Sequence, residues 1–224
     1  MTHNQYGFIF LLFAICTVGW AVSAHFAVTS ALLFWLTVSL VWVAGVYFLH
    51  RPEMLMGKRQ DGKVFLPFCF VSFPFLTIYW VAWLIRNVLL NREPVNVITG
   101  TNISISCWPG FHVPLDCYDL VIDVTSEMPS YKPSKAKYIC LPNLDGVSLD
   151  RYKLPIEINR DLLILVHCAQ GCGRSAQLAC LILVKLGYVA STAEALQILK
   201  QSRSCVKLSQ YQVAQLENFV QNNM

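Results

Sequence analysis

The residues best suited to chemistry lie in one short stretch, residues 167–175, which reads HCAQGCGRS. It offers a nucleophilic thiol at Cys168 and, after five intervening residues, a fixed positive charge at Arg174. Gly171 and Gly173 allow backbone dihedrals that other residues avoid, so the N–H groups of the loop can curl inward around an anion. A helix predicted to begin at this point adds the positive end of its dipole. The stretch therefore predicts an anion-binding loop.

Two anions fit such a loop. Without substrate, the ring of donors stabilises the thiolate form of Cys168, which is the nucleophilic form of cysteine. With substrate, the same donors bind phosphoryl oxygens, and Arg174 can do so through two parallel hydrogen bonds. The thiolate then lies in line with phosphorus, so the expected chemistry is nucleophilic attack on a phosphate ester.

The residues around this loop alternate between predicted strands and helices. Short apolar runs rich in β-branched and aromatic residues indicate strands, and a run that is apolar at every position (LLILV) leads into the loop. The predicted strands cover 118–125, 137–141 and 162–166, and the predicted helices cover 175–186, 192–201 and 209–222. This order favours an α/β fold with a central, mostly parallel sheet flanked by helices. Residues 91–102 are predicted to join this domain to the preceding part of the chain.

The pair His167-Cys168, the five-residue loop and the pair Arg174-Ser175 resemble the signature of the cysteine-dependent protein tyrosine phosphatase superfamily. Their position late in the chain resembles the dual-specificity branch, and the similarity extends over about residues 98–222. Two weaker matches, at 57–62 (GKRQDG) and 119–127 (DLVIDVTSE), are similar to a group of membrane-anchored dual-specificity phosphatases. The resemblance implies a dual-specificity-phosphatase-like domain without a metal or other cofactor.

The resemblance also implies roles for single residues. Cys168 attacks phosphorus to form a cysteinyl-phosphate, a general acid protonates the leaving oxygen, and the same group then activates water. Ser175 is similar to the hydroxyl that supports the thiolate and its departure, and His167 is similar to the residue that holds the loop's shape through hydrogen bonds. The residues expected to bind the substrate phosphate are Ala169, Gln170, Gly171, Cys172, Gly173 and Arg174.

Asp145 is the expected general acid. It lies in the loop after the predicted strand 137–141, where it matches the position of the family's acid. Asp150 is the second candidate, and either carboxylate could instead cap a turn. Only 22 residues separate Asp145 from Cys168, and Pro155 interrupts them. We therefore expect a helix of at most two turns there, or a different position for Asp145.

Other chemically active side chains have roles that the sequence leaves open. A reversible disulfide between Cys172 and Cys168 would make a redox switch, although we favour the interpretation without it. Asp123 and Glu127 are expected to be solvated at a strand end rather than to act as a catalytic pair. Arg203 either assists phosphate binding or is an ordinary helix-end charge. No second Cys/His pair has the spacing of a zinc site, which argues against a metal site.

Residues 1–91 are predicted to form a membrane region. Hydrophobic residues make up 55% of the 224-residue chain and charged residues only 13%, below the ~25% typical of soluble proteins. No Asp, Glu, Lys or Arg occurs from residue 7 to residue 49, which allows two transmembrane helices at about 6–24 and 29–49. A third apolar stretch, 64–85, contains Pro67 and Pro74 and many aromatic residues, and it is predicted to be interfacial, re-entrant or spanning.

The number of crossings decides the compartment of the catalytic domain, residues 92–224. The loop 50–63 is rich in Lys and Arg, which marks it as cytoplasmic. Two crossings keep the domain in the cytoplasm, whereas three place it outside. We favour two crossings, with the third stretch at the interface.

The expected function is that of a membrane-anchored phosphatase acting on phosphoproteins, at Tyr and at Ser/Thr. A phospholipid head-group phosphatase of the same mechanism is the first alternative, and a catalytically decayed phosphate-binding adaptor is the second. The loop positions Ala169, Gln170 and Cys172 carry no charge, which disfavours multiply phosphorylated lipids. Residues 92–224 hold twelve Lys/Arg and eleven Asp/Glu, which argues against a nucleic-acid partner. The oligomeric state is not predicted.

Overall fold

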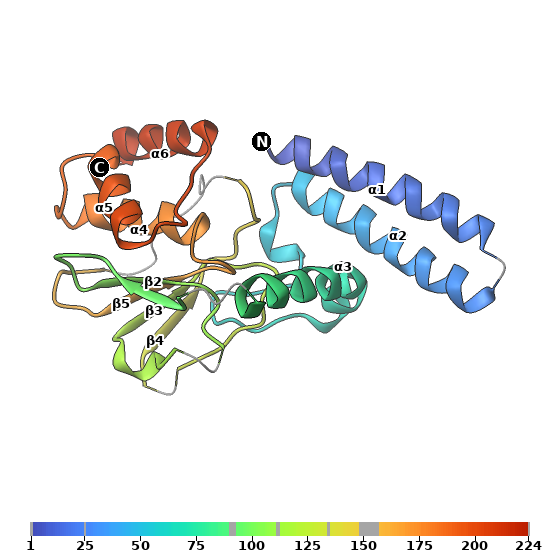
Figure 1. Ribbon diagram of the computed structural model, residues 1–224, viewed down its shortest axis with the longest axis horizontal. Helices are drawn as coiled ribbons and strands as arrows, with labels where there is room; N and C mark the ends of the chain where they lie inside the picture. Colours follow the sequence, from blue (N-terminus) through green and yellow to red (C-terminus); the bar gives the residue numbers. More distant parts are fainter. Residues whose placement is uncertain are drawn as a thin grey trace. The chain divides into compact units, whose positions relative to one another are not determined.

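The computed structural model describes residues 2–24, 26–89, 93–110, 113–133, 135–147 and 157–223. The chain divides into two compact units, one of Met1–Arg59 with Lys63–Leu90 and one of Gln60–Gly62 with Asn91–Met224 (Figure 1). The short segment Gln60–Gly62 thus belongs with the C-terminal unit, although the chain on either side of it belongs with the first.

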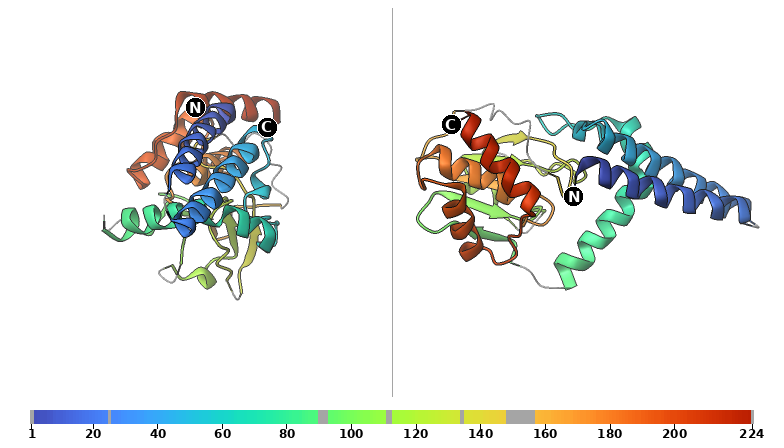
Figure 2. Two further views of the ribbon diagram at one scale, coloured as in Figure 1. Left: turned by 90° about the vertical axis from the view of Figure 1, so that its right-hand side faces the viewer. Right: turned by 90° about the horizontal axis from the view of Figure 1, so that it is seen from above.

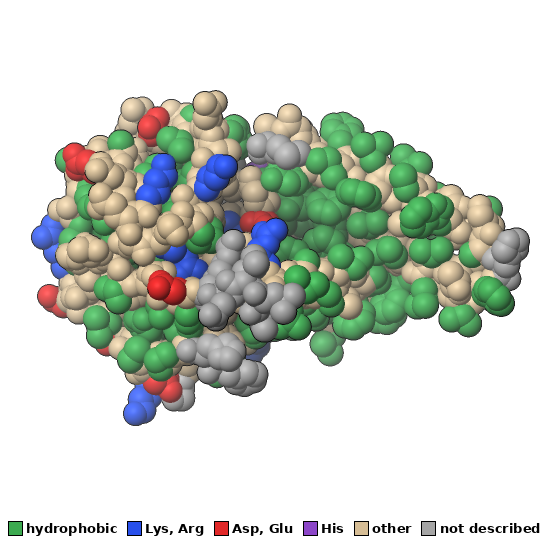
Figure 3. Space-filling model, viewed as in Figure 1, with side chains coloured by type: hydrophobic (Ala, Val, Ile, Leu, Met, Phe, Trp, Pro, Cys, Tyr) green, Lys and Arg blue, Asp and Glu red, His purple; other side chains and the backbone are tan. Residues whose placement is uncertain are grey.

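The first unit is helical. Its described elements are α1 (His3–Ser23), α2 (Ala27–Phe48), the 3-10 turn η1 (Pro52–Met54), α3 (Leu66–Leu84) and the π-helical extension η2 (Ile85–Leu89). Within the described chain, three helices are long and apolar enough to cross a membrane, the third being α3 with its extension. Hydrophobic side chains dominate the visible surface of this unit, whereas charged side chains gather on the other unit (Figure 3).

The helices α1 and α2 pack side by side as an antiparallel pair (Figures 1 and 2). The hydroxyls of Thr17 and Thr37 are hydrogen-bonded across the pair at 2.8 Å. Gly7 lies so close to the ring of Phe48 that an added Cβ would come within 2.8 Å of it. Small and hydroxylated residues therefore let the two helices approach closely, as is common between helices in lipid.

A side chain of the neighbouring helix α2 replaces the hydrogen-bond donor that Pro74 lacks in α3. Pro74 has no N–H to donate to the carbonyl of Phe70, one turn earlier. The indole N–H of Trp35, on α2, donates to that carbonyl at 3.2 Å. The carbonyl of Phe70 therefore has a donor that an apolar surrounding such as lipid would not supply.

The second unit is built on a sheet with the strand order β1-β2-β5-β3-β4. The strands are β1 (Val95–Val97), β2 (Ile103–Ser106), β3 (Leu120–Asp123), β4 (Lys137–Cys140) and β5 (Ile164–His167). β1 is antiparallel to β2, and the other neighbouring strands are parallel. The predicted mostly parallel sheet is confirmed. Within the predicted join 91–102, residues 95–97 form β1 as a short edge strand.

The helices α4 (Arg174–Lys185), α5 (Thr192–Ser202) and α6 (Gln210–Asn223) cover one face of the sheet (Figures 1 and 2). Ile164 and Val166 of β5 join the core beneath these helices, whereas Leu165 joins a smaller apolar cluster that contains Val121 and Leu115. The opposite faces follow from the alternation of side chains along a strand. Leu115 belongs to the 3-10 turn η3 (Leu115–Cys117).

The segment Gln60–Gly62 binds beside the end of β4. The carbonyl of Gln60 accepts the backbone N–H of Cys140 at 2.8 Å, and the carbonyl of Gly62 accepts the hydroxyl of Ser130. Gly62 has φ +77°, and a Cβ at this position would lie 2.8 Å from the ring of Tyr138. Only glycine therefore fits this contact.

Candidate active site

Cys168 directly follows β5, at the start of the loop that leads into α4. Its Sγ accepts the backbone N–H of Gly171 at 3.1 Å and lies 3.3 Å from the Oγ of Ser175. The Cys168 side chain is 3% exposed. The structure thus brings the expected nucleophile, a loop N–H group and the expected supporting hydroxyl together.

The loop curls because it packs tightly on the end of β2. Gly171 has φ +72°, and a Cβ there would lie 2.6 Å from the carbonyl carbon of Ser106. The backbone N–H of Trp108 donates to the carbonyl of Ala169 at 3.1 Å. A side chain at position 171 would push the loop off this strand end and move the N–H that meets Cys168.

Arg174 opens α4 and is almost fully buried. Its Nη1 and Nη2 donate to the two carboxylate oxygens of Glu127 at 2.8 and 2.6 Å, and Nη1 also donates to the carbonyl of Asn143 at 2.8 Å. The prediction that Glu127 is solvated is wrong, since only 3% of its surface is exposed. The residue lies just after β3, where it meets Arg174 from 47 positions away in the sequence.

Asp145 lies in the loop after β4, and its Oδ1 is 3.4 Å from the Nε of Arg174. Its side chain is 58% exposed. The loop is anchored next to Asp145, because the buried carbonyl of Val147 accepts the side-chain amides of Gln177 and Gln212 at 3.3 and 3.2 Å. A carboxylate that is open to solvent on an anchored loop is well placed to exchange protons.

The second acid candidate, Asp150, lies outside the described residues. So do residues 148–156, which include Pro155 and belong to the stretch where a short helix was expected. Both expectations stay predictions.

A buried polar cluster lies beside His167, the residue that precedes Cys168. Asp123 is fully buried, so its predicted solvation is also wrong, and it accepts the N–H and hydroxyl of Thr125 at 2.8 and 2.7 Å. The hydroxyl of Tyr138 donates to the same carboxylate at 2.6 Å, and Nδ1 of His167 lies 3.9 Å from it. Burial, and after it the negative charge of Asp123, raises the pKa of Tyr138 well above its ordinary value. His167 thus lies next to a hydrogen-bonded network that joins β3 and β4.

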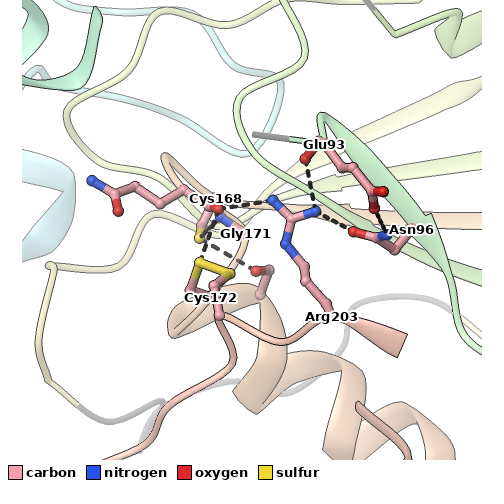
Figure 4. Close-up of a disulfide and its surroundings, with 9 residues drawn as sticks. Glu93, Asn96, Cys168, Gly171, Cys172 and Arg203 are labelled. Atoms are coloured by element: carbon pink, nitrogen blue, oxygen red, sulfur yellow. Dashed lines mark hydrogen bonds between the residues drawn. A yellow bond between two sulfur atoms is a disulfide. The ribbon is translucent and has the colours of Figure 1, made fainter. Parts of the chain in front are cut away.

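Arg203, which follows α5, contacts the loop backbone. Its Nη2 donates to the carbonyl of Gln170 at 3.1 Å. Its Nη1 donates to the carbonyl of Glu93 at 3.1 Å and to Oδ1 of Asn96 (Figure 4). Both roles considered for Arg203 stay predictions, and its buried side chain contacts the loop in either case.

Cys172, within the loop, forms a disulfide with Cys205 rather than with Cys168 (Figure 4). Cys168 is a free thiol. Cys107, another buried free cysteine, follows β2. Burial raises the pKa of Cys107, as does the neighbouring Cys168, while the positive charge of Arg203 opposes the shift. Sequence reasoning named neither Glu127 nor Cys205 as part of this site.

The arrangement can bind a tetrahedral anion between the loop N–H groups, the start of α4 and the guanidinium of Arg174. A sulfur nucleophile lies at the bottom of that site, and a solvent-exposed carboxylate, Asp145, lies at its side. Among the described residues, no group of three or more His, Cys, Asp and Glu side chains could hold a metal ion.

No protein-family model and no curated protein matches the sequence. Solved structures do match. The crystal structure of human DUSP28 is 16% identical, covers 58% of this chain and 97% of that chain, and has a TM-score of 0.44. A mouse putative dual specificity phosphatase complexed with zinc tungstate is 17% identical, with 58% and 89% covered and a TM-score of 0.47. PTPMT1 in complex with PI(5)P is 17% identical, with 58% and 96% covered and a TM-score of 0.45.

At these identities the similarity concerns the fold. The second unit combines a mostly parallel sheet, helices over one face and the signature loop between β5 and α4. This is the central, mostly parallel sheet with packed helices that the sequence predicted, with the loop at the carboxyl end of β5.

Proposed function

We propose that this chain is a membrane-anchored, cysteine-dependent phosphatase that hydrolyses phosphate monoesters, with phosphoproteins as its substrates. The observation that carries the proposal is the environment of the Cys168 sulfur, which meets the N–H of Gly171 and the hydroxyl of Ser175 in a loop that ends at Arg174. These donors suit a thiolate when the site is empty and phosphoryl oxygens when substrate is bound.

In the first step, the substrate phosphate binds the loop N–H groups and the Nε edge of Arg174, which faces Asp145. The thiolate of Cys168 attacks phosphorus while the bond from phosphorus to the leaving oxygen breaks. Asp145, in its protonated form, gives its proton to that oxygen. The products are a cysteinyl-phosphate and the free alcohol or phenol.

In the second step, the carboxylate of Asp145 takes a proton from a water molecule, whose oxygen attacks phosphorus. The phosphorus–sulfur bond breaks, and its electron pair returns to Cys168. The hydroxyl of Ser175, 3.3 Å from the sulfur, donates to the departing thiolate. Inorganic phosphate leaves, and Asp145 is protonated again for the next turnover.

The ion pair with Glu127 gives Arg174 a fixed orientation. Glu127 binds the two terminal nitrogens and Nε lies 3.4 Å from Oδ1 of Asp145, so the guanidinium is held on both sides before phosphate binds. A guanidinium that is already oriented needs no reorganisation when phosphate binds. It can therefore stabilise the negative charge of the transition state more effectively.

The substrate class rests on the loop side chains. Ala169 and Gln170 carry no charge, and Cys172 is committed to a disulfide. None of the three offers a cation for a second phosphate group, which favours singly phosphorylated side chains over polyphosphorylated lipids. A phospholipid head group with one phosphate is the alternative, favoured by the apolar helices that anchor the chain.

We also propose that α1 and α2 cross the membrane and that α3 enters it without completing a crossing, which leaves the catalytic unit in the cytoplasm. The contacts of Gln60 with Cys140 and of Gly62 with Ser130 support this topology. A segment bound to the catalytic unit shares its side of the membrane. The chain from residue 63 to residue 92 then contains an even number of crossings, and its described part holds one candidate span, Leu66–Asn87.

The test uses the full chain in detergent micelles with an aryl phosphate as substrate. We expect the wild type to release phosphate, Cys168→Ser to be inactive, and Cys117→Ser, which alters an exposed cysteine, to match the wild type. If the wild type and Cys168→Ser are equally inert but still bind inorganic phosphate, the chain is an adaptor and the proposal fails. Incubating Cys168→Ser with phosphopeptides and with phospholipid vesicles then separates the two substrate classes by capture.

A further inference from the structure

Residues 203–207 hold the phosphate-binding loop at three points. The guanidinium of Arg203 donates to the carbonyl of Gln170, the sulfur of Cys205 is bonded to that of Cys172, and the backbone N–H of Lys207 donates to the carbonyl of Cys172 at 3.3 Å. The three links reach Gln170 and Cys172 in the loop that carries the nucleophile, although the two cysteines are 33 positions apart in the sequence.

The same segment is anchored to the sheet. Figure 4 shows Arg203 between Glu93 and Asn96 on one side and the loop with Cys168 and Gly171 on the other. Arg203 is buried, and a hydrogen bond from the N–H of Val206 to its carbonyl closes a turn behind it. The segment 203–207 is therefore a fixed support against which the loop is held.

The disulfide restrains the part of the loop that binds the nucleophile. Gly171, whose N–H meets the Cys168 sulfur, lies between Gln170 and Cys172, and both of these neighbours are linked to the support. A loop that is already curled binds an anion more tightly, because the fraction of molecules in the binding-competent shape multiplies the apparent affinity.

We propose that the Cys172–Cys205 disulfide is a redox-sensitive staple that holds the phosphate-binding loop closed, with Arg203 and Cys205 as positioning residues. The proposal rests on the proposed phosphatase function. A dithiol reductant opens the staple: one thiolate attacks a sulfur of the disulfide, the second thiol resolves the mixed disulfide, and the products are two cysteine thiols and the oxidised dithiol. Both cysteines are partly exposed, whereas Cys168 is buried.

The redox state of the compartment decides whether the Cys172–Cys205 disulfide is formed. Disulfides in the cytoplasm are usually transient, because thiol reductants keep cysteines reduced there. In the proposed cytoplasmic location, a low-molecular-weight disulfide oxidises the two thiols by thiol–disulfide exchange and is itself reduced to two thiols, and the Cys172–Cys205 bond that forms raises the affinity of the loop for phosphate. The nucleophile takes no part in this bond, so closing the staple leaves Cys168 available for catalysis.

The experiment measures KM for an aryl phosphate and the inhibition constant of inorganic phosphate, for the full chain in detergent over a series of dithiothreitol concentrations. For the wild type, we expect both constants to rise by the same factor, about three- to tenfold, as the disulfide is reduced, while kcat stays unchanged. Reactivation of oxidised Cys168 would change the amount of active enzyme and therefore Vmax, but not KM. Peptide mapping of the 172–205 crosslink follows the reduction.

Two variants make the test decisive. Cys205→Ser is expected to show the raised constants at every dithiothreitol concentration, and Cys117→Ser is expected to respond like the wild type. If wild-type KM and the inhibition constant do not change while the crosslink disappears, the staple is refuted and the phosphatase proposal stands. If no variant hydrolyses substrate, the function fails, and calorimetric binding of phosphate with and without dithiothreitol still decides the staple. If Cys205→Ser does not fold, the dithiothreitol titration of the wild type still tests the proposal.

Discussion

The guanidinium of Arg174 and the carboxylate of Glu127 form a buried, two-pronged ion pair with nitrogen–oxygen distances of 2.8 and 2.6 Å. Arg174 ends the loop that follows β5, and Glu127 follows β3, which pairs with β5 in the sheet. Because both groups are shielded from water, removing either one leaves a buried, unpaired charge and lowers the stability of the fold. The pair therefore links the anion site to the sheet.

Glu127→Gln is expected to reduce kcat/KM by about a hundredfold, because an unpaired guanidinium no longer keeps its orientation toward the phosphate. Removing one charge of a buried pair should also lower the free energy of unfolding by about 3–5 kcal/mol. Steady-state kinetics and thermal unfolding check the two effects. The control is Glu217→Gln, which alters an exposed carboxylate on α6. Wild-type kcat/KM in Glu127→Gln would contradict the role of the pair.

Gly171→Ala is expected to abolish most activity. Alanine at φ +72° is strained by about 1–2 kcal/mol, and its Cβ would meet the carbonyl carbon of Ser106 at 2.6 Å. The loop must then move the N–H that binds the Cys168 sulfur. Gly173→Ala is the matched comparison, because nothing lies within 4 Å of a Cβ there and φ is −117°. We expect a clearly smaller loss in kcat/KM for Gly173→Ala, and equal losses would count against the steric argument.

Asp145→Asn is expected to lower kcat by about 10²- to 10⁴-fold for substrates with poor leaving groups, since asparagine cannot donate a proton to the leaving oxygen. The loss should shrink for aryl phosphates whose phenols leave easily without protonation. A series of aryl phosphates, measured by phosphate release, gives this dependence. Asp161→Asn, at an exposed carboxylate, should behave like the wild type. An equal loss across all leaving groups would remove Asp145 from the acid role.

The parts of the fold and site that the sequence predicts are those encoded over short distances. The apolar run that becomes β5, Cys168 directly after it, Gly171 in the turn and Arg174 at the helix start all lie within one continuous stretch. Local rules of strand burial, glycine conformation and helix termini are enough to interpret it. Asp145 was reachable in the same way, as a carboxylate in the loop after a predicted strand.

The parts that were missed depend on folding over long distances. From the sequence, Glu127 looks like an ordinary polar residue at a strand end. Only the pairing of β3 with β5 brings Arg174 next to it. The partner of Cys172 could not be chosen among nine cysteines without the turn that follows α5. β1 has only three residues, too few for an alternation pattern to stand out from a linker.

A labelling experiment is expected to place residues 26 and 117 on opposite sides of the membrane. Residue 26 begins the α2 side of the turn between α1 and α2, and Cys117 lies on the surface of the catalytic unit. If α3 does not cross, an impermeant maleimide should label Cys117 in inside-out vesicles only. It should label Phe26→Cys, in a Cys117→Ser background, in right-side-out vesicles only. Labelling of both positions from the same side would show that α3 crosses, contrary to the contacts of Gln60 and Gly62.

Tyr138→Phe is expected to change how stability depends on pH. The hydroxyl of Tyr138 donates to buried Asp123 at 2.6 Å, and burial together with that carboxylate raises the pKa of Tyr138 above its ordinary 10.0. Above pH 10 the unfolded chain therefore loses this proton while the folded chain keeps it. The stability that the tyrosine contributes is complete below that pH and is lost as the pH rises toward the folded-state pKa.

A proton that the folded chain keeps and the unfolded chain has lost makes the free energy of unfolding fall by about 1.4 kcal/mol per pH unit. Denaturant unfolding of the full chain, followed by tryptophan fluorescence between pH 8 and 11, should show a steeper loss above pH 10 for the wild type than for Tyr138→Phe. Tyr211→Phe, on α6, should keep the wild-type slope. The variant starts from a lower stability, because the buried Asp123 loses a donor at every pH. Its curve should therefore converge on that of the wild type as the pH rises, and curves that stay parallel would show that Tyr138 ionises alike in both states.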